Sequence, residues 1–289
     1  MTTARSLLFV PANGEHKIEK AFAGAADGVI LDLEDAVAVS QKAAARDTLA
    51  ATLAAMRGRK PAYVRVNAVS TPYCFRDLMA LPLRDLAGVL VPKVESAEEA
   101  WTVDWMLLQL EAEQGVGPRS VPVVAMIETA RGLTRIDAIA GATPRITRIA
   151  WGAVDFAHDT NAALGDRAAT EQAHFALVRA SRNAGLEAPI DAPGIDFSDP
   201  ERLRADAQRA RAMGFGGKLC IHPAQLAVVH EVFRPTADEI ARAQRIVAAF
   251  DAAEAAGSAA IAVDGQMIDY PVVLRARRVL EAAASVAGG

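Results

Sequence analysis

The sequence predicts an α/β protein, a (β/α)8 TIM barrel with a C-terminal helical extension. Short apolar runs alternate with longer amphipathic stretches along most of the 289 residues, the pattern of repeated βα units around a parallel sheet. These runs are rich in Val, Ile and Leu and are bounded by Gly, Pro and Asn, which suits strands buried on both faces. Eight such strands in series favour a closed barrel, and an open doubly wound sheet is the alternative.

The predicted strands are residues 6–11, 28–33, 62–67, 87–93, 121–127, 148–152, 189–192 and 218–221. Between them lie stretches rich in Ala, Leu, Glu and Arg at helical spacing. They predict helices over residues 40–57, 97–113, 170–184 and 199–213. These helices are expected to cover the outside of the sheet.

The chain is expected to divide into two parts. Residues 1–233 form the barrel that carries the candidate site, and residues 234–289 form a C-terminal extension. The extension reads as a helix, an irregular segment over residues 257–270 and a last helix. Because closing a barrel does not need it, the extension is either a lid or a segment swapped between subunits.

Charge and cysteine usage exclude several classes of protein. The net charge is −4 and the 31 basic residues are scattered, so we expect no nucleic-acid partner and no membrane partner. Charges or Pro break every long apolar stretch, and the first eleven residues lack the features of a secretory signal. Cys74 and Cys220 lie far apart without a metal-binding companion. These features together predict a cytoplasmic protein whose partners are small molecules or other protein chains.

Acidic residues follow several of the predicted strands, where a (β/α)8 barrel carries its active site. Glu34 and Asp35 follow the second strand, Glu128 the fifth, and Asp155 the sixth. Converging carboxylates repel one another unless a cation lies among them, and Mg²⁺ typically takes one or two protein carboxylates. The sequence therefore predicts Mg²⁺ on Glu128 and Asp155. The alternative is that these acids cap helices or pair with arginines.

Basic residues near the predicted strand ends carry further hypotheses. Strand alternation directs Arg65 into the barrel, where it neutralises Glu34 or binds a substrate carboxylate or enolate oxygen, and the two roles can coexist. Lys17 either meets a phosphate or is solvated surface. The lone His222 is not assigned as a base. No phosphate-binding loop or dinucleotide fingerprint is present, which argues against nucleotide hydrolysis and dinucleotide redox chemistry.

Six motifs in order resemble the citrate lyase β-subunit-like family, with its malyl-CoA and citramalyl-CoA lyases, in the wider HpcH/HpaI aldolase superfamily. They are residues 6–11 (SLLFVP), 31–37 (LDLEDAV), 64–67 (VRVN), 127–129 (IET), 152–156 (GAVDF) and 217–223 (GKLCIHP). The tail, residues 263–271 (VDGQMIDYP), looks like the C-terminal motif of the same lyases.

This resemblance implies roles for particular residues. It implies that Glu128 and Asp155 bind Mg²⁺, that Arg65 binds substrate, and that Glu34 and Asp35 support the site. It also implies a homo-oligomer, a trimer or hexamer, in which Asp269 of one subunit completes the site of its neighbour; the residues alone equally suit a helix-capping acid there. The residues implied to contact CoA are Phe9, Pro11, Lys17, Ile221 and Pro223.

The activity that the resemblance implies is cleavage of a carbon–carbon bond beside a CoA thioester. The substrate is a 3-hydroxyacyl-CoA of the malyl, citramalyl or citryl type, and the products are acetyl-CoA and a 2-oxo acid formed through a thioester enolate. Two other functions remain open. One is a pyruvate-type class II aldolase that acts without CoA, and the other is a non-catalytic citrate lyase β-like subunit that binds an acyl carrier protein.

Overall fold

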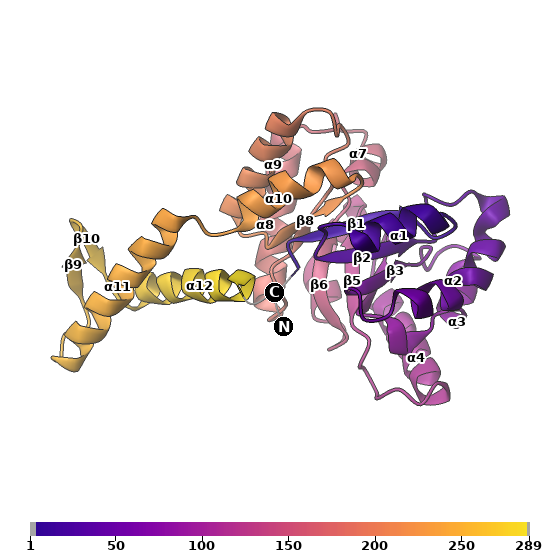
Figure 1. The fold of residues 1–289 in the computed structure, drawn as a ribbon, viewed down its shortest axis with the longest axis horizontal. Helices are drawn as coiled ribbons and strands as arrows, with labels where there is room; N and C mark the ends of the chain where they lie inside the picture. Colours follow the sequence, from indigo (N-terminus) through magenta and orange to yellow (C-terminus); the bar gives the residue numbers. More distant parts are fainter. Residues whose placement is uncertain (1–3, 288–289) are drawn as a thin grey trace. The chain divides into compact units, whose positions relative to one another are not determined.

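The structure, a computed structural model, describes residues 4–287. The eight strands β1 to β8 form one closed parallel barrel, in which each strand pairs with the next one along the chain (Figure 1). Strand β8 pairs with β1, with Leu219 opposite Leu7, so the barrel has no open edge. The predicted (β/α)8 fold is therefore confirmed, and the alternative of an open doubly wound sheet is wrong. Residues 1–3 of the predicted barrel part and residues 288–289 of the predicted extension lie outside the described residues. The strands are β1 Ser6–Pro11, β2 Gly28–Asp32, β3 Ala62–Arg65, β4 Gly88–Val91, β5 Val123–Ile127, β6 Ile146–Trp151, β7 Ile190–Asp191 and β8 Gly217–Cys220.

Helices follow the strands because the sequence supplies both apolar faces and start signals. Ser96 accepts a hydrogen bond from the Glu99 amide at the start of α4, and Asp199 followed by Pro200 starts α9. The helices of this part are α1 Glu15–Ala23, α2 Lys42–Met56, α3 Cys74–Met79, α4 Ala97–Glu113, α5 Ala130–Thr134, α6 Ile136–Ala140, α7 Ala153–Thr160, α8 Arg167–Asn183, α9 Pro200–Met213 and α10 Leu226–Phe233. Short 3₁₀ turns occur at Val39–Gln41, Leu83–Asp85 and Pro223–Gln225.

The barrel interior is a packed apolar core. Alternate strand residues point inward, so each strand contributes one face to the core and the other to the surrounding helices. The buried interior residues are Leu7, Ile30, Leu90, Val124, Met126, Ala150, Ile190 and Leu219, and Phe9 and Tyr63 pack against them. Because this core is filled, the open space for chemistry lies at the carboxyl ends of the strands.

Buried ion pairs lie outside this interior. The ammonium of Lys218 on β8 donates to Asp191 on β7, and His174 Nε2 on α8 lies 3.0 Å from the other Asp191 carboxylate oxygen. All three side chains are buried. The positive charge of Lys218 outweighs the effect of burial and lowers the pKa of Asp191 to about 2. Asp191 is therefore ionised throughout the neutral range.

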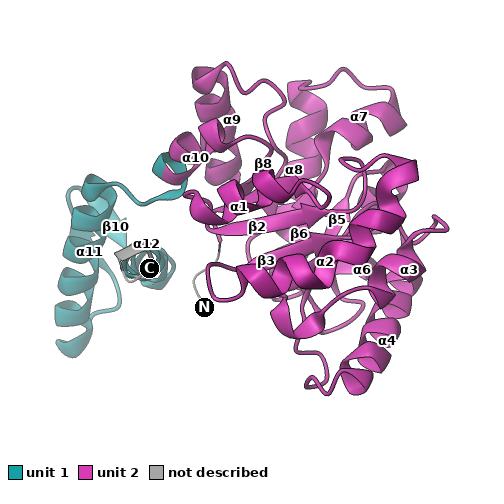
Figure 2. Cartoon of the chain, turned by 45° about the vertical axis from the view of Figure 1, so that its right-hand side comes forward, with its two compact units in different colours: residues 1–2, 231–289 teal, residues 3–230 magenta. Residues whose placement is uncertain are grey.

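The chain forms two compact units, one ending at His230 and the other beginning at Glu231 (Figure 2). The second unit contains α11 Ala237–Ala255, the strands β9 Ile261–Val263 and β10 Gln266–Ile268, and α12 Tyr270–Ala287. It has an apolar core of its own, made by Ala243, Ile246, Phe250, Ile268, Val273 and Ala276. Its role as lid or swapped segment stays a prediction.

The prediction that residues 257–270 are irregular is wrong. Residues 261–268 form an antiparallel hairpin in which Val263 pairs with Gln266. Asp264 and Gly265 both have positive φ, 52° and 74°, as a two-residue turn of this kind requires. Asp-Gly between alternating apolar residues is a strong hairpin signal, so the sequence held this information.

Candidate active site

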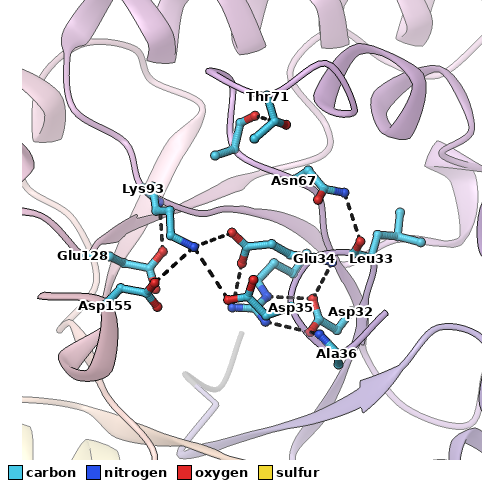
Figure 3. A network of polar contacts seen from close by, with 12 residues as sticks. Asp32, Leu33, Glu34, Asp35, Ala36, Asn67, Thr71, Lys93, Glu128 and Asp155 are labelled. Atoms are coloured by element: carbon cyan, nitrogen blue, oxygen red, sulfur yellow. Dashed lines mark hydrogen bonds and ion pairs between the residues drawn. The ribbon is translucent and has the colours of Figure 1, made fainter. Parts of the chain in front are cut away.

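Five charged side chains meet at the carboxyl ends of β2 to β6 (Figure 3). The acids among them are Glu34 after β2, Glu128 after β5, and Asp155 in the first turn of α7. The cations are Arg65, the last residue of β3, and Lys93, which follows β4. The predicted strand-end residues are therefore brought together in one network, with Lys93 as an addition that the sequence reasoning missed.

Arg65 is held rigidly by Asp32, the last residue of β2. Its Nε and Nη2 donate to the two carboxylate oxygens at 2.7 and 2.6 Å, a bidentate pair. Asp32 also accepts the amides of Glu34 and Ala36, so each of its oxygens binds twice. The guanidinium lies over the Phe9 ring, 4.6 Å from its centroid, so the aromatic ring covers one face of the guanidinium.

Glu34 lies between the two cations. Lys93 Nζ donates to Glu34 Oε1 at 2.7 Å, and Arg65 Nη1 is 2.9 Å from Oε2. Burial raises the pKa of Glu34 although both cations oppose the shift. Asp35 is exposed, and its carboxylate lies 3.6 Å from the same ammonium. Glu34 is thus a buried member of the network and Asp35 an outer one.

Glu128 is almost completely buried, with 1% of its surface exposed. Burial, reinforced by the negative charge of Glu34, raises the pKa of Glu128 to about 7. One of its oxygens accepts the backbone N–H of Lys93 at 2.9 Å. A carboxylate in such a place is costly unless a cation compensates it, so the environment favours binding of a positive ion.

The residue at position 152 determines how much space is available to the Glu128 side chain. A Cβ built on Gly152 would overlap the Glu128 carboxylate and its Cγ. The φ angle of Gly152 is −113°, which other residues adopt easily, so the need for glycine is steric. Gly152 therefore lets the carboxylate occupy this position.

Asp155 and Glu128 lie next to each other in Figure 3, and Lys93 contacts both of them. Lys93 Nζ is 3.3 Å from Asp155 Oδ1. Asp155 keeps about a third of its side chain exposed, at 33%, so it borders the open mouth. Two oxygen ligands at one edge of a mouth suit a hard divalent cation whose remaining ligands are water or substrate oxygens.

Lys93 was not among the basic residues predicted for the site, which were Arg65 and Lys17. The neighbouring acids raise its pKa: burial opposes the shift, but the Glu34 hydrogen bond and the charges of Glu34, Glu128 and Asp155 outweigh it. Its position directly after the fourth apolar run was the available signal. The sequence pattern gives no hint of its backbone, which has a φ of 50°.

A layer of buried polar side chains supports the site from behind. Lys42 Nζ on α2 donates to the carbonyls of Leu33 and Glu34, each at 2.7 Å. The Asn67 amide donates to the Leu33 carbonyl at 2.9 Å, and its backbone N–H donates to Asp77. These bonds fix the loop that carries Glu34.

Of the residues expected to contact CoA, Phe9 and Pro11 lie in β1, Lys17 lies on α1, and Ile221 and Pro223 follow β8, the strand that neighbours β1. Pro11, Lys17 and Ala36 line a shallow surface pocket, and the Lys17 side chain is exposed. Ile221 and Pro223 are exposed after β8, beside His222, which stacks on Phe197 at 4.6 Å. This edge of the barrel mouth therefore offers both apolar and basic surface.

Asp269 belongs to the C-terminal unit, where it starts α12. Its carboxylate accepts the Val272 amide at 3.4 Å and its carbonyl accepts the Val273 amide at 3.0 Å. The helix-capping reading of Asp269 is therefore correct within this unit. Its role in catalysis stays a prediction.

The described part of the chain contains no cluster of three or more His, Cys, Asp or Glu side chains arranged to hold a metal. A two-carboxylate site that leaves room for water and substrate is consistent with that finding. In the same residues no helix is long and apolar enough to cross a membrane. Fold and site together define a TIM-barrel protein in which acidic side chains, bridged by Arg65 and Lys93, surround the mouth of the barrel; we call this region the acidic mouth.

Comparison with known proteins places this barrel in a family. The HpcH/HpaI aldolase/citrate lyase family matches residues 5–223. A (3S)-malyl-CoA thioesterase and an L-malyl-CoA/beta-methylmalyl-CoA lyase, both of Cereibacter sphaeroides, are 38% and 34% identical and are aligned over 98% and 96% of this chain and 95% and 94% of their own lengths. The protein CitE of Mycobacterium tuberculosis, solved with magnesium, acetoacetate and coenzyme A, has a TM-score of 0.79 and 33% identity, and the match covers 98% of this chain and all of that one.

The chain belongs to the HpcH/HpaI aldolase/citrate lyase family. The resemblance that the six motifs predicted is therefore confirmed, and with it the assignment to a family of lyase enzymes.

Proposed function

We propose that this protein is a Mg²⁺-dependent carbon–carbon lyase that cleaves a 3-hydroxyacyl-CoA of the malyl, citramalyl or citryl type to acetyl-CoA and a 2-oxo acid. The observation that carries the proposal is the position of buried Glu128 beside Asp155 (Figure 3) at a barrel mouth where Arg65 contacts Glu34. The names of the relatives, a malyl-CoA lyase and a CitE bound to magnesium and coenzyme A, support the same chemistry.

The residues present fit a magnesium ion. Glu128 is buried with a raised pKa and Asp155 is about one third exposed, which provides one fixed and one accessible oxygen ligand. Bound there, Mg²⁺ would polarise the hydroxyl and carboxylate oxygens of a 3-hydroxy acid. The contribution of the chain is to fix both carboxylates: Gly152 leaves room for Glu128, and the Lys93 amide orients it.

We infer that Arg65 stabilises negative charge on the substrate. Its guanidinium has five N–H donors, of which three face Asp32 and Glu34. Within the described residues no further partner occupies the other two. A fixed cation in a largely buried position stabilises a developing thioester enolate oxygen without reorganising. We assign this role to Arg65.

The CoA moiety is proposed to bind at the edge formed by the loops after β1 and β8. Lys17 offers a cation for a phosphate, and Ile221 with Pro223 offers apolar surface for the pantetheine arm. The side chain of Phe9, under the Arg65 guanidinium, connects this edge to the acidic mouth.

We further propose that the active form is a homo-oligomer in which Asp269 of one subunit serves the site of another. A carboxylate near the thioester carbon would return a proton to the enolate during cleavage and remove it during condensation. Asp269 is half-buried at the start of α12 and carries one weak amide contact, so its carboxylate keeps free acceptor capacity.

Thioester hydrolysis is the second candidate function. A relative with 38% identity is named (3S)-malyl-CoA thioesterase, and it matches this chain over almost its whole length. Such an enzyme breaks the carbon–sulfur bond of the substrate and releases CoA. The same acidic mouth and CoA edge would serve both reactions, so the products must decide between them.

Product analysis tests the proposal. The purified protein is incubated with malyl-CoA and citramalyl-CoA, with Mg²⁺ or with excess EDTA, and the products are separated by mass. Acetyl-CoA with glyoxylate or pyruvate, formed only with Mg²⁺, is the expected result. Free CoA with malate would indicate the thioesterase. Absence of both, with citryl-CoA also uncleaved by folded protein, would contradict the proposed function and favour an aldolase without CoA or a non-catalytic subunit.

A further inference from the structure

Lys93 contacts more of the acidic mouth than any other side chain in it. Its ammonium lies 2.7 Å from Glu34, 3.3 Å from Asp155 and 3.6 Å from Asp35 (Figure 3). Its backbone N–H donates to Glu128 at 2.9 Å. Lys93 thus contacts both carboxylates that we assign to Mg²⁺, those of Glu128 and Asp155, and also the buried carboxylate of Glu34.

The backbone holds Lys93 in this place independently of its side chain. Its φ of 50° lies in the left-handed region, which a residue with a Cβ adopts at a cost and which persists where the surrounding structure enforces it. Such strained positions cluster at functional sites. The Lys93 amide therefore stays on Glu128 whatever its ammonium does.

The three contacts of the ammonium differ in strength. The contact to Glu34 is a short hydrogen bond to a buried oxygen, whereas Asp155 is more distant and 33% exposed. Bringing a divalent cation to Asp155 places a second positive charge beside the ammonium, and the two repel each other. The contact to Asp155 is weaker than that to Glu34 and is made to a carboxylate that we assign to the metal, so it is the one to be given up.

We propose that the Lys93 ammonium is the internal counter-ion of the metal site: it neutralises Asp155 in the metal-free protein, yields that carboxylate to Mg²⁺, and remains on Glu34. This inference rests on the proposed function only in assigning Mg²⁺ to Glu128 and Asp155. Lys93 is thereby a positioning residue that sets metal affinity, because every Mg²⁺ ion that binds must displace one ammonium contact.

Metal titration of charge variants tests the proposal without any substrate. Lys93→Met removes the ammonium and keeps the stem, Lys93→Arg keeps the charge, and Lys20→Met removes a lysine from the exposed face of α1 as a matched control. By calorimetry, Lys93→Met should bind Mg²⁺ roughly tenfold more tightly, the change expected for loss of one near-surface charge repulsion. The arginine and control variants should stay near the wild type.

Thermal unfolding gives a second readout. Without its counter-ion the acidic mouth repels itself, so chelator-treated Lys93→Met should melt below chelator-treated wild type and gain more from added Mg²⁺. If Lys93→Met does not fold, Lys93→Gly serves instead, since glycine adopts a φ of 50° without strain and keeps the amide to Glu128.

Two results would overturn the proposal in distinguishable ways. Unchanged or weaker Mg²⁺ binding in both the methionine and the glycine variant would show that Lys93 does not compete with the metal, and would leave the lyase proposal standing. No Mg²⁺ binding by the wild type would remove the metal site itself, and both proposals with it.

Discussion

Gly152 and Glu128 touch across the ends of neighbouring strands, so that a side chain at position 152 and the Glu128 carboxylate cannot occupy their places together. Strand β6 pairs with β5, with Trp151 opposite Ile127, and each strand continues into one of these two residues. The shape of the proposed metal site therefore depends on a residue that supplies no ligand.

The first prediction concerns this contact. Gly152→Ala should displace the Glu128 carboxylate and weaken Mg²⁺ binding by about 10- to 100-fold, the loss typical of residues that position a ligand. Gly141→Ala is the matched control, because its Cβ would meet only the Asp137 carbonyl at an ordinary 3.6 Å. Calorimetric titration with Mg²⁺ measures both. Equal affinity in the two variants would show that Glu128 does not need its observed position.

Replacement of Arg65 should affect catalysis more than folding. Arg65→Lys keeps the positive charge but loses the two-pronged contact to Asp32, so the cation is no longer fixed beside the substrate. We expect kcat to fall by roughly 10²- to 10³-fold, as when a donor that stabilises an anion is removed. Steady-state kinetics measure this loss. A lysine variant with wild-type kcat would remove Arg65 from the mechanism.

The Asp191–Lys218 pair should contribute to stability rather than chemistry. Asp191→Asn leaves a buried ammonium without its charge partner, which costs about 3–5 kcal/mol, whereas the double variant with Lys218→Met should recover most of the loss. Urea unfolding of the two single variants and the double variant measures this coupling. Additive losses would show that the two groups act independently.

The same pair predicts a pH dependence. The pKa of Asp191 is lowered by Lys218 from 3.8 to about 2, so the unfolded chain binds the proton more readily in acid. The stability it provides is fully present above 3.8 and is lost as the pH falls towards 2. Thermal unfolding between these limits should therefore show a steeper loss for wild type than for the double variant. Parallel curves would contradict the assignment.

The fold was readable from the sequence because each strand is a short β-branched or leucine-rich run with a clear boundary. The nearness of Glu128 and Asp155 was equally readable, since parallel strands bring their carboxyl ends to one edge. The role of Lys93 was not, because it depends on a left-handed backbone and on contacts to three other loops. The local sequence pattern carries no information about the backbone conformation of Lys93 or about its contacts to other loops.

The C-terminal unit shows a different limit. The Asp264-Gly265 dipeptide is a sequence signal for a two-residue turn, so the hairpin could have been predicted from the sequence although it was not. What Asp269 contacts in an assembly depends on how subunits meet, which no periodicity reports. The sequence supplies the candidate residue, and an experiment must supply its partner.

A site shared between subunits predicts complementation. Asp269→Asn and Glu128→Gln should each be inactive, but subunit exchange between them creates hybrid oligomers in which some sites combine an intact Asp269 with an intact Glu128. Mixed samples should then recover part of the wild-type rate. Mass spectrometry of differently labelled subunits verifies the exchange. No recovery after verified exchange would place Asp269 outside the neighbouring site.

The most direct test of the account is the Mg²⁺-dependent release of a 2-oxo acid from malyl-CoA or citramalyl-CoA by wild type, Glu128→Gln and Asp155→Asn. The amide variants keep the shape of each side chain and remove the charge that binds the metal. The account predicts that both variants fold, fail to bind Mg²⁺ and release no 2-oxo acid. Wild-type turnover in either folded variant would contradict the assignment of catalysis to a metal held by Glu128 and Asp155.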